Sequence, residues 1–428
     1  MPPLDARRGS FRDPGPLKYR DPLLRNVAAH PLLKVRPAGS FLQGPLPTGC
    51  ALCEAGAKMV LFVTGVCHYK CFYCPISDEK RMNRAAWANE RKLDTSDMEA
   101  AMRSLVEEAR SLNAKGTGIT GGDPMYDPER TLAFIRRLKA EFGPKHHIHL
   151  YTQIPFDPKW LDALQEAGLD ELRFHPPDET WVAPPEQYQK LWLQAREMEK
   201  RGLWDVGFEI PCIPGSHEQM WKLVEWLDAN GFKFLNVNEM EFSETNYEAL
   251  LARGYRIKDS ETSRAMDSEE VAREVMRRAS DAGIKTAIHF CSSPFKDRVQ
   301  LRQRLARQAS RMAKPYEVAT EDGTLVRGVI ECADPGGMVE EIVAAFDVDR
   351  TLLEALPGRV HVAPWLLEQF AEEVPDPAYL SEVYPTATAL EVERVPLNEP
   401  AEGAPPRRQP TAVERELADL HKLGRPGQ

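Results

Sequence analysis

The 428-residue sequence has no apolar run near the roughly twenty residues that are needed to cross a bilayer. Its opening segment, MPPLDARRGS, lacks the apolar block of a secretory signal peptide. Cysteine is also scarce, with 8 residues in the whole chain and several of them bunched. This number and distribution exclude a disulfide framework in a chain of this size. These absences predict a cytoplasmic protein and make metal binding the better explanation of the cysteines.

Positive charge is in short supply as well. The formal net charge is −10 at pH 7, which argues against a nucleic-acid partner because phosphate binding needs a local excess of Lys and Arg. One stretch departs from this balance, with only Asp297 opposing its basic residues. These are Lys296, Arg298, Arg302, Arg304, Arg307, Arg311 and Lys314. Such a helix is either a solvated surface or a site for a phosphate or RNA backbone.

A fourth cysteine is missing beside the triplet Cys67, Cys71 and Cys74, which is spaced C-x3-C-x2-C in the segment CHYKCFYC. Iron–sulfur clusters held for electron transfer usually take four protein thiolates, so three would leave one iron of a four-iron cluster open to a substrate or cofactor. Catalysis is therefore the first hypothesis. The alternatives are a zinc site with its fourth ligand elsewhere, or small buried residues.

The spacing of the triplet, with the aromatic pair Phe72-Tyr73 before its last cysteine, resembles the signature of radical S-adenosylmethionine (SAM) enzymes. Overall the chain is similar to uncharacterised prokaryotic proteins related to pyruvate formate-lyase activating enzymes. The resemblance implies a [4Fe–4S] cluster on Cys67, Cys71 and Cys74, whose open iron chelates SAM. It further implies reductive cleavage of SAM to methionine and a radical that abstracts a hydrogen atom, with ferredoxin or flavodoxin as reductant.

Short apolar runs alternate with helical patterns from about residue 59 to residue 312, which predicts a parallel sheet of βα units. The expected strands lie near 59–65, 116–121, 147–153, 169–175, 205–211, 232–240 and 285–291. The expected helices lie near 96–111, 129–142, 158–167, 186–201, 217–229 and 268–283. The resemblance implies a partial (β/α)6 TIM-like barrel, and the last strand would then be an addition to it.

Composition divides the chain into four parts. Residues 1–58 are rich in Pro and Arg without a core pattern, and we expect an N-terminal arm that wraps the barrel or stays mobile. The barrel follows over 59–312. Residues 315–398 predict a small α+β domain, because Asp322-Gly323 lies between β-rich flanks as in a hairpin, with helices expected at 337–346 and 364–373. Residues 399–428 read as a flexible tail with a marginal helix near 414–423.

Three sets of residues are candidates for holding SAM. The segment Gly121-Gly122-Asp123-Pro124 resembles the GGE-type segment of the superfamily, which implies that its backbone and acid hold the SAM amino group, although Asp is one methylene shorter than Glu. Tyr73 belongs to the cysteine signature. The third set follows from strand alternation, which turns polar residues into the lumen of a barrel. It comprises Tyr151, Arg173, Glu209, Asn236 and Asn238, with Arg173 expected on the SAM carboxylate.

A second metal site is a further hypothesis. Cys50 and Cys53 have the spacing of half a tetrahedral site. His289 and Cys291 could complete a Cys3His zinc site, or other cysteines such as Cys212, Cys291 or Cys332 could join them in an auxiliary iron–sulfur cluster. Spacing alone does not choose between zinc and iron.

These observations together predict a radical SAM enzyme that acts on a protein or an RNA, since an added domain offers a surface for a macromolecule. Two other classes remain open. One is an iron–sulfur electron-transfer protein, which would need a fourth nearby thiolate. The other is a zinc-containing nucleic-acid-binding protein, which would use Cys50, Cys53 and the Arg-rich helix.

Overall fold

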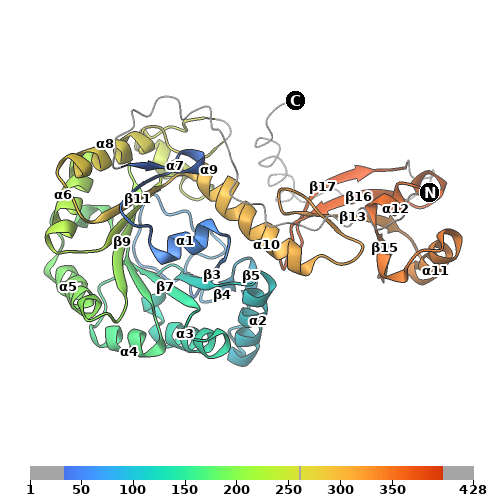
Figure 1. Ribbon diagram of the computed structural model, residues 1–428, viewed down its shortest axis with the longest axis horizontal. Coiled ribbons are helices and arrows are strands. Elements are labelled where there is room, and N and C mark those ends of the chain that lie inside the picture. Colours follow the sequence, from blue (N-terminus) through green and yellow to red (C-terminus); the bar gives the residue numbers. More distant parts are fainter. Residues whose placement is uncertain (1–32, 260–261, 399–428) are drawn as a thin grey trace.

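The computed structural model describes residues 33–259 and 262–398, and its larger part is a curved sheet of seven parallel strands in chain order. The strands are β3 (Lys58–Phe62), β6 (Gly116–Thr120), β7 (His147–Thr152), β8 (Glu171–Phe174), β9 (Asp205–Cys212), β10 (Phe234–Glu239) and β11 (Ala287–Cys291). Figure 1 shows them curving into a ring that the helices surround. The partial TIM-like barrel is confirmed.

Six helices connect the parallel strands close to the predicted ranges. They are α2 (Met98–Ser111), α3 (Pro128–Phe142), α4 (Lys159–Ala167), α5 (Glu186–Lys200), α6 (His217–Ala229) and α8 (Ser268–Asp281). Local chemistry sets their ends. The carboxylate of Asp97 accepts from the amides of Glu99 and Ala100 and so caps α2, whereas Gly168, with φ 100°, ends α4 in the left-handed conformation.

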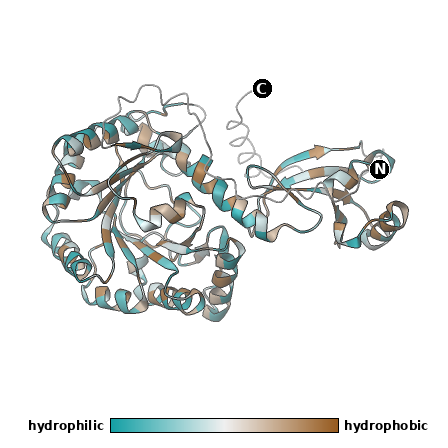
Figure 2. Cartoon of the chain, viewed as in Figure 1, coloured by the Kyte–Doolittle hydropathy of each residue, from teal (hydrophilic) through white to brown (hydrophobic). Residues whose placement is uncertain are grey.

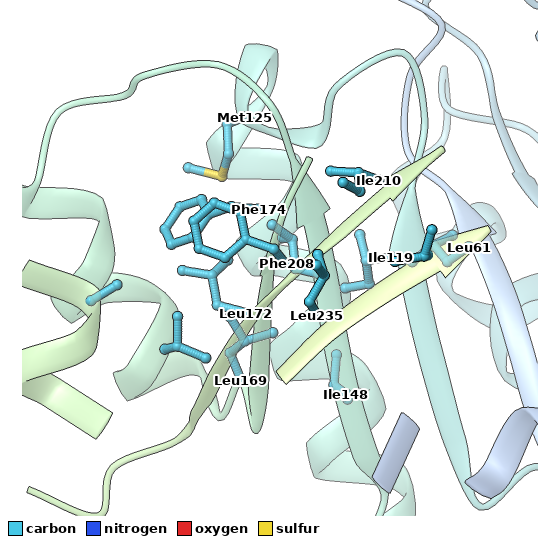
Figure 3. Close-up of a cluster of buried hydrophobic side chains, with 14 of the residues drawn as sticks. Leu61, Ile119, Met125, Ile148, Leu169, Leu172, Phe174, Phe208, Ile210 and Leu235 are labelled. Carbon is cyan, nitrogen blue, oxygen red and sulfur yellow. The ribbon is translucent and has the colours of Figure 1, made fainter. Parts of the chain in front are cut away.

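The hydrophobic core lies between the sheet and its helices. Leu61, Ile119 and Leu172 are fully buried on the outward side of their strands, and Figure 3 shows them with aromatic partners such as Phe174 and Phe208. In Figure 2 hydrophilic and hydrophobic residues alternate along the outer helices, as expected for helices with one face packed on a sheet. The outward face of each strand is therefore covered by helices, and the opposite face of the strand lines the lumen.

The N-terminal segment is not the arm without a core that the sequence predicts. The short β1 (Lys34–Val35) pairs with β2 (Phe41–Gln43), and β2 extends the sheet by pairing antiparallel with β11. The helix α1 (Thr48–Glu54) then enters the ring, where Figure 1 shows it at the centre. For these residues the expectation of an arm that wraps or stays mobile was wrong.

Small residues make room for α1 inside the barrel. A Cβ on Gly116 would lie 2.7 Å from the Cδ1 of Leu52, and a Cβ on Gly49 would lie 2.5 Å from the guanidinium of Arg173. Glycine is therefore required both at Gly116 in β6 and at Gly49 in α1. The amide of Gly49 faces the carboxylate of Glu171 at 3.4 Å, which anchors the beginning of the helix.

The other edge of the sheet carries a hairpin that the sequence did not reveal. The strand β4 (Ala86–Ala88) pairs antiparallel with β3, and β5 (Arg91–Leu93) pairs antiparallel with β4. Asn89, in the turn between them, has φ 50°, and its side-chain oxygen accepts from the Val60 amide at 2.9 Å. This turn covers backbone groups at the edge of β3.

A second sheet follows the helix α10 (Arg302–Met312), which joins it to the barrel in Figure 1. It consists of β12 (Val318–Ala319), β13 (Leu325–Glu331), β14 (Leu353–Leu356), β15 (Arg359–Val362), β16 (Ala378–Val383) and β17 (Glu391–Pro396), all antiparallel. Helices α11 (Pro335–Phe346) and α12 (Pro364–Leu367) pack on it around a separate core that includes Ile330, Val360 and Leu367.

The predicted hairpin at Asp322-Gly323 is present, since β12 pairs with β13 across it. The predicted tail and its marginal helix lie outside the described residues. Within the described ranges, none of the helices has the length and apolar character that a membrane span requires.

Candidate cluster and cofactor site

The cysteine triplet lies in the loop that leaves the carboxyl end of β3, where barrel folds carry their chemistry. Cys67, Cys71 and Cys74 are all partly exposed. Burial raises the pKa of the Cys67 and Cys71 thiols to about 11. Binding of iron must therefore displace a proton from each of these thiols at neutral pH.

The segment Gly121-Gly122-Asp123 fixes the beginning of this loop. The Gly122 amide donates to the carbonyl of Thr64 at 2.6 Å, and the Asp123 amide donates to the carbonyl of Val66 at 3.0 Å. A Cβ on Gly121 would lie 2.4 Å from the Thr64 oxygen, and one on Gly122 would lie 2.5 Å from the Val66 oxygen. The two glycines thus permit a close backbone approach to the cysteine loop, and the predicted approach to SAM stays a prediction.

Asp123 is buried, and its carboxylate is occupied by protein donors. It accepts from the amides of Met125, Gln153 and Ile154 at 2.9, 2.7 and 3.1 Å, and from the hydroxyl of Thr152 at 3.0 Å. Burial raises its pKa to about 6, although these hydrogen bonds act in the other direction. The arrangement favours a role in holding the end of β7, and the contact with the SAM amino group stays a prediction.

Gln153 connects Asp123 to the thiols. It follows β7, and its Nε2 donates to the Sγ of Cys67 at 3.0 Å while its Oε1 lies 3.7 Å from the Sγ of Cys71. One amide therefore spans two of the three cysteines. Strand alternation places Gln153 on the lumen side, but nothing in the sequence indicates that it would contact the cysteine loop.

The two aromatic residues of the loop have different surroundings. Tyr73 is buried, its carbonyl accepts from the Nδ2 of Asn246 at 3.1 Å, and burial raises the pKa of its phenol. Phe72 stacks on Tyr255 with ring centroids 5.9 Å apart, and the guanidinium of Arg253 lies 4.4 Å from its centroid. The expected contact between Tyr73 and SAM stays a prediction.

A cavity of about 440 Å³ opens beside Phe72. It is lined by the acids Asp178 and Glu179, by Arg253 and Tyr255, and by the turn from Ile213 to Ser216 that follows β9. The cavity thus borders the cysteine loop at Phe72, near the carboxyl ends of the strands.

The polar residues predicted to face the lumen do meet, with Glu209 at their centre. Its Oε2 accepts from the NH1 of Arg173 at 2.6 Å and from Asn236 at 3.1 Å, and its Oε1 accepts from Asn238 at 2.9 Å. Arg173 also donates to the hydroxyl of Tyr151 at 3.2 Å. Alternation therefore identified one connected network across β7, β8, β9 and β10.

Arg173 itself is committed to the protein. It is 1% exposed and pairs with Glu171 as well as with Glu209. Burial alone would raise the pKa of Glu171, but Arg173 and His147 lower it to about 2. This pairing favours a structural role for Arg173, but its buried NH2 has no hydrogen-bond partner among the described residues, and the contact with the SAM carboxylate stays a prediction. Glu171 is a residue that the prediction missed, although its position two before Arg173 placed it on the same face.

The other proposed metal ligands also lie in the barrel. Cys50 and Cys53 are on α1, Cys291 ends β11, and His289 faces the lumen two residues before it. Cys212 does not join them, because its buried thiol donates to the carbonyl of Ser268 on the helix side. Cys332 lies in the core of the second sheet.

Only one group in the described ranges has the spacing of ligands around a single ion. His147, His149 and Glu171 have ligand atoms within 4.8 Å of one another, and Glu171 is already the ion-pair partner of Arg173. The cysteine triplet is more widely spread than this, so its geometry does not favour one zinc ion shared by three thiols.

The Arg-rich helix packs against the barrel through part of its basic face. In α10, Arg304 pairs with Glu90, Arg307 donates to the carbonyl of Asn113 at 3.0 Å, and Arg311 donates to the carbonyl of Arg110 at 3.1 Å. These acceptors belong to the β4–β5 hairpin and the end of α2. These contacts bind part of the basic face to the barrel, whereas Arg311 remains exposed, and the site for a phosphate or RNA backbone stays a prediction.

The fold and the cysteine loop define an iron–sulfur enzyme built on a partial barrel, and the comparisons with known proteins agree. Residues 61–227 match the family model described as the radical SAM superfamily, and residues 323–397 match a domain of unknown function. A protein of Methanocaldococcus jannaschii, provisionally named a glycyl-radical enzyme activating enzyme, is 39% identical over 360 residues, which cover 82% of this chain and 93% of that protein.

Solved structures are similar at lower identity. Methylornithine synthase is 15% identical with a TM-score of 0.36 and covers 57% of this chain and 72% of its own. Streptococcus suis SuiB bound to its precursor peptide SuiA is 15% identical with a TM-score of 0.39, covering 57% and 51%.

This chain belongs to the radical SAM superfamily. It is therefore an enzyme that uses a [4Fe–4S] cluster and SAM. The donor set fits that group, since three thiols at the predicted spacing lie together on the loop after β3.

Proposed function

We propose that this protein is an activating enzyme that removes a hydrogen atom from a glycine residue of a partner protein. The observation that carries the proposal is the relative with 39% identity, whose provisional name assigns it this activity and which matches over 93% of its length. The likeness thus extends well beyond the segment from 61 to 227 that the superfamily model matches.

The residues support this chemistry in different ways. Cys67, Cys71 and Cys74 would hold the cluster, with the open iron supplying the one-electron cleavage of SAM once a reductant such as ferredoxin or flavodoxin has delivered the electron. Gln153 and Asp123 fix the geometry of the loop. The cavity beside Phe72 gives a loop of the partner protein a way to the cluster.

An RNA substrate is less well supported. The Arg-rich face of α10, which was the reason to consider RNA, is occupied by Glu90 and by carbonyl groups of the barrel. The rest of the chain has an excess of acidic residues. A protein substrate is therefore the better proposal.

The first test is anaerobic reconstitution with iron and sulfide, followed by dithionite and SAM and an assay for 5′-deoxyadenosine. The wild type should form it, and Cys71→Ala should reduce the yield by a factor of 100 or more, on the order of the loss expected when an essential group is removed. Cys332→Ala is the matched control, because this cysteine lies in the second domain.

The second test addresses the substrate. Glycyl-radical enzymes of the source organism, prepared without the radical and labelled with α-deuterated glycine, should acquire an organic radical and transfer deuterium into 5′-deoxyadenosine. If 5′-deoxyadenosine forms but carries no deuterium, the proposal for glycine is wrong while the superfamily chemistry stands.

A further inference from the structure

Three more cysteines, which are distant in sequence, face the lumen of the barrel. Cys50 and Cys53 lie one turn apart on α1, and Cys291 ends β11. The side chain of Gln300, in the π-helical segment η6 (Lys296–Leu301), connects two of them. Its Oε1 accepts from the Sγ of Cys53 at 3.0 Å, and its Nε2 donates to the Sγ of Cys291 at 3.4 Å.

This arrangement repeats the one at the catalytic triplet. There the amide of Gln153 spans Cys67 and Cys71, at 3.0 and 3.7 Å. In both places two thiols lie at opposite atoms of one glutamine amide. The triplet serves as the comparison within this chain, because we propose that its cysteines hold the [4Fe–4S] cluster.

The spread of the thiols favours a cluster over a single ion. In neither the catalytic triplet nor the set of Cys50, Cys53 and Cys291 do all three sulfur atoms lie within 4.8 Å of one another in the described ranges. A tetrahedral zinc ion would need its thiolates gathered at about 2.3 Å from one centre. Sulfur atoms at the corners of a cluster are held apart by the iron and sulfide between them.

His289 is the candidate for a fourth ligand. His289 precedes Cys291 by two residues, so both side chains point into the lumen. The imidazole is 4% exposed, and neither ring nitrogen has a hydrogen-bond partner among the described residues. Burial of an imidazole without a hydrogen bond at either nitrogen is unfavourable in free energy, and binding to a metal would give one nitrogen a partner.

The charges around these thiols are mixed. The NH1 of Arg173 donates to the Sγ of Cys50 at 3.5 Å, and Arg173 is also paired with Glu171 and Glu209. Lys58 interacts electrostatically with Cys53, and Lys296, which is paired with Glu241, interacts with Cys291. Three cations thus lie near the thiols and would offset part of the negative charge of thiolates bound to iron and sulfide.

We propose that Cys50, Cys53 and Cys291, with His289 as fourth ligand, hold a second iron–sulfur cluster inside the barrel. With four protein ligands it has no open iron, so it would not bind SAM and is an electron-carrying centre. The position of α1 in the lumen follows from this, since the helix delivers two of the ligands. The inference does not depend on which substrate the enzyme activates.

The test is iron and acid-labile sulfide content after anaerobic reconstitution of the full chain. The wild type should hold about eight iron atoms, as two four-iron clusters require. The variant Cys67→Ala/Cys71→Ala/Cys74→Ala should keep half of the iron, and so should Cys50→Ala/Cys53→Ala. Cys332→Ala should keep all of it.

Spectroscopy of the variant without the catalytic triplet isolates the second centre. Its reduced cluster should give an electron paramagnetic resonance signal that SAM does not perturb and that His289→Cys shifts. Circular dichroism checks that each variant is folded, and Cys291→Ser serves as the single replacement if the double variant is not.

Two results would overturn the inference. One is complete loss of iron and sulfide when the catalytic triplet is removed from a folded chain. The other is stoichiometric zinc that disappears in Cys50→Ala/Cys53→Ala, because the same residues would then hold a single ion. Neither result depends on formation of 5′-deoxyadenosine.

Discussion

The Nε2 of Gln153 lies 3.0 Å from the Sγ of Cys67 and donates a hydrogen bond to it. The glutamine is held in place from behind, because the carboxylate of Asp123 accepts from its backbone amide at 2.7 Å. A buried acid on the loop after β6 thus positions an amide on the loop after β7 against a thiol on the loop after β3. Three loops of the barrel meet in this chain of contacts.

Gln153→Leu should make the cluster harder to reduce. Hydrogen bonds to ligand sulfurs stabilise the more negative reduced state, so their loss lowers the reduction potential, here by tens of millivolts. Redox titration followed by electron paramagnetic resonance measures the shift. Gln187→Leu, on the exposed side of α5, is the control, and equal potentials in both variants would show that the amide does not tune the cluster.

Asp123→Asn should destabilise the protein by about 1–3 kcal/mol, because its amide group would face the donors of Gln153 and Ile154 or those of Met125 and Thr152. Urea unfolding of the iron-free chain measures the change. An unchanged midpoint would mean that these donors find other acceptors.

The pH dependence of that difference has a defined sign. Burial raises the pKa of Asp123 from 3.8 to about 6, so the folded state binds the proton more tightly than the unfolded state does. This proton binding adds to the free energy of unfolding at low pH. The added free energy, about 3 kcal/mol, is lost as the pH rises through about 6. The advantage of the wild type over Asp123→Asn should therefore be larger at pH 4.5 than at pH 7.

The strands and the lumen network could be predicted because their pattern is local. Leu172 and Phe174 must face the helices, which leaves Arg173 inward whatever the rest of the chain does. The same rule placed Tyr151, Glu209, Asn236 and Asn238. It does not say whether an inward polar group meets a ligand or another residue, and for Arg173 the partners are Glu171 and Glu209.

The missed elements depend on contacts that no local pattern encodes. The segment TGCALCE has no apolar stripe for the outside of a barrel, and it becomes a helix where Gly116 leaves room for Leu52. The strands of the β4–β5 hairpin have three residues each, which is too short for a readable period. Charge alone could not show that Arg307 binds carbonyl groups of α2.

Gly122→Ala should abolish cluster loading. A Cβ there would lie 2.5 and 2.6 Å from the carbonyl oxygens of Val66 and Gly65, so the cysteine loop must move. We expect a loss of stability of at least about 3 kcal/mol, at the upper end for an overpacked site. Iron content and thermal unfolding measure the two effects.

Gly336→Ala is the control for that substitution. The nearest neighbour of an added Cβ at Gly336 is an oxygen of Asp334 at 3.6 Å, which is ordinary contact. This variant should load iron as the wild type does. Normal loading in Gly122→Ala would refute the close packing of the two loops.

The double substitution Arg307→Ala/Arg311→Ala should weaken the packing of α10 on the barrel without changing RNA binding. The two side chains donate to the carbonyls of Leu112 and Asn113, just after α2, and to that of Arg110, which also accepts from the amide of Asn113. Their loss should lower the free energy of unfolding by about 1–3 kcal/mol and speed hydrogen exchange in α10 and the last turn of α2. Arg136→Ala, at an exposed position of α3, should do neither.

Because these arginines bind the barrel, gel-shift assays with a structured RNA should give the same weak binding for both variants and the wild type. A selective loss of binding in the double variant would instead support the phosphate interpretation of this helix.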